Sequence, residues 1–228
     1  MTYVAAETVP ISPKISTDAP VARRTPVPEF DFVLFGGAGD LTRRKLLPSL
    51  LRRDAEGVLP AKGRIISIGR EACDTETFVA HALAGVEDPG KGTLSRFRSR
   101  LSYVGMDATD AHAYGSLSEL LRGSNAVRVF YLAVAPQLFA PICGALAAAG
   151  LATPESRVVV EKPIGRDLAS SQGINDAVGQ VFTEDQIYRI VPAPACWPGS
   201  AASCRRLGCT LRMACNLGKL MNWMRSPR

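Results

Sequence analysis

FVLFGGAGDLT, residues 32–42, is the most informative stretch of this chain. Residues 30–35 form a short apolar run that two glycines end, and this pattern predicts a buried strand. Residues 41–53 follow with leucines spaced so that they share one side of a helix. A strand, a glycine-rich turn and an amphipathic helix, in that order, are the opening unit of an α/β fold.

The same alternation continues along the chain as far as residue 190. Short apolar runs predict five further strands, at residues 64–68, 101–104, 127–133, 157–161 and 186–190. Helical patterns lie at residues 75–83, 94–100, 111–121, 137–149 and 168–182, with Asp110 as an N-cap and Gly150 after a helix end. Strands separated by helices in this way predict a Rossmann-like, doubly wound parallel sheet with right-handed crossovers. The pattern does not give the strand order.

Composition divides the 228 residues into three parts. Residues 1–28 are rich in Pro, Thr and Ser, so we expect a flexible leader; Glu7 and Asp18 argue against a transit peptide. Residues 29–190 carry the strand–helix alternation and form the expected Rossmann domain. Residues 191–228 contain six basic residues and no acidic residue, and so carry the whole formal net charge of +6. We expect an aberrant, disordered basic tail there.

The cysteine content also distinguishes residues 1–190 from residues 191–228. Residues 1–190 contain only Cys73 and Cys143, as expected in a reducing compartment, and the tail holds the other four. The tail has no C-x₂-C pair, so it predicts no metal site, and out-of-frame or foreign translation explains it better than nucleic-acid binding does. The chain has neither a secretory pattern nor an apolar run of the roughly 18 residues that a membrane helix needs. We therefore expect a cytoplasmic protein with no membrane or nucleic-acid partner.

The glycine-rich turn at residues 36–42 is a candidate phosphate site. Glycines after a first strand let the backbone approach a pyrophosphate, and the following helix adds N–H groups and a positive dipole end. The generic G-x-G-x-x-G spacing does not fit, because its second and third glycines fall on Ala38 and Leu41. A tight turn without a ligand therefore stays open as an alternative.

The residue after the second strand bears on which dinucleotide would bind. An acid there would bond the ribose 2′-hydroxyl of NAD, whereas Arg70 stands in its place and favours the 2′-phosphate of NADP. Glu71 follows and complicates the choice. A solvated surface arginine is the alternative interpretation.

A third candidate follows the fifth strand. The sequence EKPIGRDL, residues 161–168, places Lys162 at the carboxyl end of a parallel strand, where ligands bind in such sheets. Lys162 is a candidate contact for a substrate oxygen or phosphate. A solvated lysine at a proline-ended strand is the alternative.

Together these segments resemble glucose-6-phosphate dehydrogenase. FVLFGGAGDLTRRKLLP, residues 32–48, is similar to that family's phosphate turn GxxGDLxxRKLxPxL. The resemblance continues through Gly69-Arg70, Tyr103 to Asp110, FYLAVAP at 130–136 and VEKPIGRDL at 160–168, and it covers residues 30–190.

The resemblance implies NADP as the coenzyme and glucose 6-phosphate as the substrate. It implies oxidation at C1 to 6-phosphogluconolactone, a reaction of glucose metabolism in the pentose phosphate pathway. Arg70 would select NADP, Asp107, Ala108 and Tyr131 would lie near the coenzyme, and Lys162 would contact both the coenzyme side and the sugar phosphate. The phosphate turn would consist of Gly36, Gly37, Ala38, Gly39, Asp40, Leu41 and Thr42.

The sequence departs from the family after Ile190. The family continues with DHYLGKE, which binds the sugar phosphate, whereas this chain reads VPAPACW at residues 191–197. We expect the family's histidine base and its C-terminal α+β substrate domain to be missing, since neither His81 nor His112 matches that base. We expect no retained catalytic residue, loss of the family oligomer and a truncated, inactive form. An NADP-binding module without catalysis and a non-functional frameshifted product are the alternatives.

Overall fold

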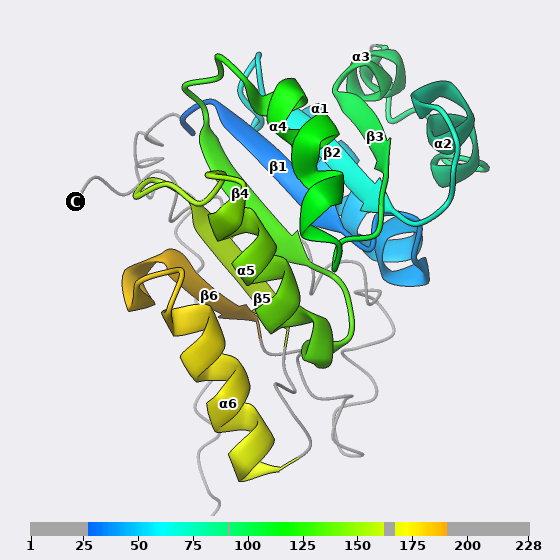
Figure 1. Ribbon diagram of the computed structural model, residues 1–228. Coiled ribbons are helices and arrows are strands. Elements are labelled where there is room, and N and C mark those ends of the chain that lie inside the picture. Colours follow the sequence, from blue (N-terminus) through cyan, green and yellow to red (C-terminus); the bar gives the residue numbers. More distant parts are fainter. Residues whose placement is uncertain (1–26, 91, 162–166, 191–228) are drawn as a thin grey trace, which may run out of the picture.

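The computed structural model describes residues 27–90, 92–161 and 167–190 (Figure 1). The expected tail and most of the expected leader, as well as Lys162, lie outside these residues. Val27, at the end of the expected leader, is buried against the core. Six strands form one sheet: β1 (Phe30–Phe35), β2 (Arg64–Gly69), β3 (Leu101–Gly105), β4 (Val127–Leu132), β5 (Arg157–Glu161) and β6 (Ile187–Ile190).

All the strands pair in parallel, in the order β3-β2-β1-β4-β5-β6. At the centre, Val33 of β1 lies between Ile66 of β2 and Phe130 of β4. The chain first builds outward from β1 to β3 and then returns to β1 to build toward β6. The strand order therefore reverses between β1 and β4, which is where doubly wound sheets bind their ligands. The predicted fold class is confirmed.

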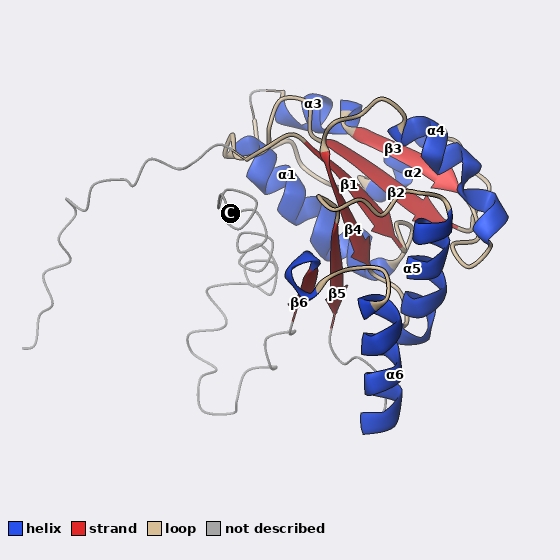
Figure 2. Ribbon diagram, turned by 60° about the vertical axis from the view of Figure 1, so that its left-hand side comes forward, coloured by secondary structure: helices blue, strands red, loops and turns tan. Residues whose placement is uncertain are grey.

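Helices cover both faces of the sheet (Figure 2). One face packs against α1 (Leu47–Ala55), α2 (Thr75–Ala82) and α3 (Thr93–Ser99). The other face packs against α4 (Gly115–Leu121), α5 (Phe139–Ala148) and α6 (Leu168–Gly179). Short helical turns complete the elements: η1 (Thr42–Leu46), η2 (Ala111–Tyr114), η3 (Pro136–Leu138) and η4 (Glu184–Gln186).

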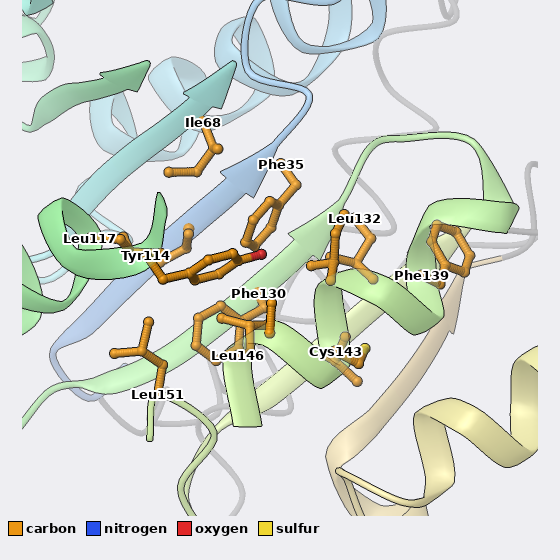
Figure 3. Packing of buried hydrophobic residues seen from close by; sticks show 14 of the residues in the cluster. Phe35, Ile68, Tyr114, Leu117, Phe130, Leu132, Phe139, Cys143, Leu146 and Leu151 are labelled. Carbon is orange, nitrogen blue, oxygen red and sulfur yellow. The ribbon is translucent and has the colours of Figure 1, made fainter. Parts of the chain in front are cut away.

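The alternation of side chains along each strand divides the core in two. In β1, Phe32 and Leu34 enter the core under α1, whereas Val33 and Phe35 enter the core under α4 and α5. Figure 3 shows the second core, where Phe35 and Tyr114 lie close together, with ring centroids 6.4 Å apart. Every residue of β1 is buried, as expected for a central strand covered on both faces.

The helix predicted over residues 41–53 contains an irregular turn. Leu47 N–H donates to Thr42 O, a π-type bond that makes Thr42–Leu46 wider than an α-helical turn. Pro48 follows, and it has no N–H to offer the carbonyl four residues earlier, where its ring would also clash. We attribute the widened turn to this proline, which the leucine spacing alone does not reveal.

The predicted helix ends are mostly confirmed. Asp110 is an N-cap whose carboxylate accepts from His112 N–H at 2.9 Å, and Gly150 follows α5 with φ of 66°. The last helix ends at Gly179 rather than at residue 182. The short turn η4 follows and explains the earlier end. Thr183 caps η4, since its N–H donates to Gln186 Oε1, and the chain then enters β6.

A buried ion pair joins the amino ends of β1 and β2. Arg64 donates from Nε and Nη2 to the two carboxylate oxygens of Asp31, at 2.6 and 2.8 Å, and Ser124 Oγ donates to the same carboxylate at 2.7 Å. The Asp31 side chain is fully buried, while that of Arg64 is 36% exposed. Because the carboxylate accepts three hydrogen bonds, its burial is compensated, and the register of β1 against β2 is held at the amino edge of the sheet.

Within the ranges that the structure describes, no helix has both the length and the apolar character needed to cross a bilayer.

Candidate functional site

A cleft of about 790 Å³ opens at the carboxyl edge of the sheet, above β1, β2, β3 and β4. It therefore lies at the point where the strand order reverses, and its volume is within the ~300–1,000 Å³ typical of small-molecule sites. Its walls come from the loops after these strands. They are Gly36, Ala38, Gly39, Ile68, Gly69, Arg70, Glu71, Met106, Asp107, Ala108, Thr109, Val134, Ala135 and Leu138.

The first wall is the glycine-rich turn after β1. Gly36 has φ of 81°, and a Cβ there would lie 2.3 Å from Ala133 O, so this position accepts only glycine without a shift of the backbone. The Gly36 carbonyl accepts from Gly39 N–H at 3.0 Å and from Thr42 Oγ1 at 2.9 Å. These two bonds close the turn and fix its shape.

Gly37 explains the unusual glycine spacing. Its N–H donates to Ile68 O at 2.8 Å, and a Cβ would lie 2.5 Å from Ser67 Cβ. The second glycine thus lets the turn pack directly on β2 and does not itself line the cleft. Of the seven residues predicted for the turn, Gly36, Ala38 and Gly39 line the cleft. Gly37 and Thr42 do not line the cleft, and their contacts hold the turn in place.

Two other residues of the predicted turn lie outside the cleft. Asp40 is exposed and pairs with Arg44 at 3.5 Å, one helical turn further on. Leu41 packs against the core under α1. Arg43 N–H donates to Gly39 O, so the first helical turn begins directly after the glycine turn. N–H groups in the first turn of a helix point toward its N-terminus, which here is the glycine turn.

Arg70 follows β2, lines the cleft and is exposed. Its loop is fixed on both sides: Gly69 O accepts from Met106 N–H at 2.8 Å, and Glu71 O accepts from Tyr103 Oη at 2.8 Å. Burial, followed by the charges of Cys73 and Glu71, raises the pKa of Tyr103 to about 12, so the phenol remains a donor at neutral pH.

Asp107 and Ala108 follow β3 and also line the cleft. Asp107 Oδ1 accepts from Thr109 N–H at 2.9 Å and from Thr109 Oγ1 at 2.8 Å. These bonds, and to a smaller extent the positive charge of Arg70, lower the pKa of the Asp107 carboxyl. Ala108 O accepts from Tyr114 Oη at 2.7 Å, so the loop is tied to the core beneath it.

The structure does not place Tyr131 in the cleft. Its ring is fully buried on the face of the sheet that α1 covers, and its hydroxyl donates to Glu161 Oε1 at 2.5 Å. Burial, together with the charge of Glu161, raises the pKa of this phenol. Glu161 ends β5 and immediately precedes Lys162, which lies outside the described residues.

Neither histidine of the chain reaches the cleft. His81 is exposed near the end of α2, and His112 is exposed on η2. Neither lies among the residues that line the cleft. Among the described residues, no group of three His, Cys, Asp or Glu side chains is arranged to hold a metal ion.

The apolar part of the cleft was not predicted from the sequence. Ile68, Met106, Val134 and Leu138 line it, and apolar residues at strand ends look like core residues in a sequence pattern. Their one signal was position, since each follows or ends a predicted strand at its carboxyl end or begins the next helix.

The residues present suit a phosphorylated dinucleotide. The turn and helix N-terminus offer backbone N–H groups to a pyrophosphate. Arg70 offers a charged fork, and the apolar residues offer surface to a base and ribose.

Comparison with known proteins agrees with this geometry. Residues 33–191 match the family model described as glucose-6-phosphate dehydrogenase, NAD binding domain. Glucose-6-phosphate 1-dehydrogenase from Mycolicibacterium smegmatis is 49% identical over 177 residues, which are 73% of this chain and 36% of the relative. The enzyme from Gluconobacter oxydans is 45% identical over 173 residues, which are 72% of this chain and 35% of the relative.

Two solved structures superpose on the same part of the chain. The structure of glucose-6-phosphate 1-dehydrogenase from Mycobacterium avium has a TM-score of 0.65 at 34% identity and covers 72% of this chain and 36% of its own. A glucose-6-phosphate dehydrogenase in complex with its substrate glucose-6-phosphate also has a TM-score of 0.65, at 28% identity, and covers 73% of this chain and 37% of its own. The chain thus spans about a third of the length of the curated relatives it matches. It belongs to the glucose-6-phosphate dehydrogenase family, and its Rossmann domain is the coenzyme-binding domain of that family.

Proposed function

We propose that residues 29–190 bind NADP and form the coenzyme-binding part of an enzyme that oxidises glucose 6-phosphate at C1 to 6-phosphogluconolactone, in the pentose phosphate pathway. The observation that carries the proposal is that Arg70 lines the same cleft as the glycine turn. An arginine in that position suits the 2′-phosphate that distinguishes NADP from NAD. Family membership supports the reaction.

Each wall of the cleft has its own part in this proposal. The glycine turn and the helix N-terminus would hold the pyrophosphate, and Arg70 would bind the 2′-phosphate. Asp107 and Ala108 would lie beside the adenosine half, where Met106 and Ile68 supply apolar surface. The nicotinamide of the bound coenzyme supplies the acceptor for the substrate's hydride.

Two further predicted residues keep proposed roles at the nicotinamide side of the cleft. Lys162 would contact the sugar phosphate, as the family resemblance implies. Tyr131 would act from the core, through its hydrogen bond to Glu161 at the end of β5. Its side chain would then position the strand end rather than touch the coenzyme.

The 228-residue chain by itself would bind the coenzyme without oxidising the sugar. Its two histidines are exposed on helices away from the cleft, so neither is placed as a general base there. The absence of a general base typically costs ~10²–10⁴-fold in rate. The working location we propose is the cytoplasm, which the unpaired Cys73 and Cys143 support.

Calorimetry combined with an activity assay tests this proposal. Titration of the purified chain with NADP should show one site per chain and a weaker response to NAD. The same preparation mixed with NADP and glucose 6-phosphate should give no NADPH absorbance. A folded chain that binds neither nucleotide would overturn the coenzyme role, and steady NADPH production would overturn the claim that the chain alone is inactive.

A further inference from the structure

The cleft that carries Arg70 also carries an opposing charge. Asp107 also lines the cleft, on the loop after the strand that pairs with β2. The two loops are joined one residue earlier, where Met106 N–H donates to Gly69 O at 2.8 Å. Arg70 and Asp107 each follow one of these hydrogen-bonded residues, and both line the cleft in which Arg70 is proposed to bind the 2′-phosphate.

The carboxylate is fixed independently of Arg70. Among the described residues, its hydrogen bonds come from Thr109 alone, through the N–H at 2.9 Å and Oγ1 at 2.8 Å. Both bonds go to Oδ1 and hold the side chain in an Asx turn. A carboxylate anchored by its own loop keeps its place when a ligand enters, whereas one held by Arg70 would exchange its partner for the phosphate.

We propose that Asp107 is a specificity-determining residue that reduces the preference for NADP over NAD by repelling the 2′-phosphate. This inference rests on the proposed coenzyme-binding function. A phosphomonoester carries about −1.5 to −2 charges at neutral pH, and a fixed carboxylate within a Debye length, ~8–10 Å, opposes it. The 2′-hydroxyl of NAD is neutral and is not opposed. Arg70 and Asp107 together set the ratio of the two affinities.

The effect is expected to be modest because both charges are exposed to water. Exposed charge pairs change an affinity by about two- to fivefold, and added salt reduces the change. The charge of Arg70 contributes to the low pKa of the Asp107 carboxyl, although the Thr109 bonds contribute more. This electrostatic coupling agrees with the geometry of the two loops.

Two ligands that differ only at the 2′ position isolate the effect. The probes are 2′-phospho-ADP-ribose and ADP-ribose, and their affinities for the 228-residue chain are measured by calorimetry. Asp107→Asn removes the charge and retains an oxygen that can accept from Thr109 N–H. The ratio of the two affinities should rise about two- to fivefold in favour of the 2′-phosphate at low salt, and the rise should shrink in about 0.5 M salt, where the Debye length is a few ångströms.

Asp110→Asn is the matched control. It removes the same charge three residues further on, at an N-cap that does not line the cleft. This variant should leave the ratio unchanged. Asp107→Ser, which also removes the charge and can still accept from the loop amide, is a second variant in case the asparagine disturbs the loop.

The outcomes distinguish a failure of the proposed role of Asp107 from a failure of the proposed coenzyme function. A ratio that stays constant or falls in both Asp107 variants overturns the inference, and so does an equal rise in Asp110→Asn. If the unmodified, folded chain binds neither probe, the proposed coenzyme function fails instead. A rise confined to the Asp107 variants, and reduced by salt, supports the role of Asp107.

Discussion

Thr42 Oγ1 donates to the carbonyl of Gly36 at 2.9 Å, across the turn that opens the candidate coenzyme site. Thr42 is fully buried, so this bond fixes the turn from inside the protein and not from the cleft. The same carbonyl accepts from Gly39 N–H at 3.0 Å. The shape of the turn that we propose binds phosphate thus depends on a side chain that does not line the cleft.

Thr42→Val therefore tests the turn through its hydroxyl alone. The substitution keeps the shape of the side chain and removes one buried hydrogen bond, which should lower the free energy of unfolding by ~1 kcal/mol. Binding of NADP and of NAD should weaken by the same factor, since both carry the pyrophosphate. Denaturant unfolding and calorimetry measure the two effects. Thr42→Ser, which retains the hydroxyl, should lie near the unmodified chain, and selective weakening of one coenzyme would contradict the assignment.

Gly36→Ala should be strongly destabilising for two reasons. The left-handed backbone costs an alanine ~1 kcal/mol or more. The added Cβ would also lie 2.3 Å from Ala133 O, and such overpacking adds ~1–3 kcal/mol. Gly57→Ala is the matched control, because Gly57 also has positive φ, 66°, but no atom lies within 4 Å of the position that its added Cβ would take. Thermal unfolding of the two variants should differ, and equal midpoints would refute the close approach at Ala133.

Arg70→Ala should shift coenzyme preference. A charge-assisted bond to a phosphate contributes ~1.5–3 kcal/mol, so NADP affinity should fall about tenfold or more. NAD affinity should change little, since NAD has no 2′-phosphate. Arg98→Ala removes the same charge from the exposed surface of α3, outside the cleft, and is the control. A parallel loss of both coenzymes in Arg70→Ala would remove its selective role.

Alkali should unfold the domain in the range where Tyr103 titrates. Burial raises the pKa of this phenol to about 12, above the ~10 of an unfolded chain. The folded state therefore holds the proton more tightly. The associated stability is complete below about pH 10 and is lost as the pH rises toward about 12. Burial raises the pKa of Tyr114 and Tyr131 as well.

The measurement is denaturant unfolding between about pH 8 and pH 12, with tyrosinate absorbance followed in parallel. Tyr103→Phe removes one titrating group, so its loss of stability with alkali should be smaller than that of the unmodified chain. Its stability at about pH 8 should also fall by ~1 kcal/mol, because the bond to Glu71 O is lost. An unchanged alkaline slope would show that Tyr103 is not the group responsible.

Much of the fold was predictable because its signals are local. The apolar run of β1, the cap at Asp110 and the glycine after α5 each depend on neighbouring residues, and the structure confirms them. The strand order was not predictable, because burial on both faces makes central strands look alike. The widened turn before Pro48 was missed because leucine spacing describes a helix face and not its hydrogen bonds.

The candidate site was predictable where chemistry marks a residue. Gly36, Gly39 and Arg70 carry such marks, and they do line the cleft. Met106, Val134 and Leu138 were missed because apolar walls cannot be told from core residues by type. Tyr131 illustrates the converse: it adjoins the site in sequence, but alternation along β4 directs its ring into the core under α1, toward Glu161.

The most direct test is a crystal structure of the 228-residue chain grown with NADP. We expect the 2′-phosphate within hydrogen-bonding distance of the Arg70 guanidinium and the pyrophosphate against the backbone of Gly36–Thr42. A nucleotide bound away from the carboxyl edge of β1 and β2, or a well-ordered cleft that stays empty at saturating NADP, would contradict the proposed coenzyme site.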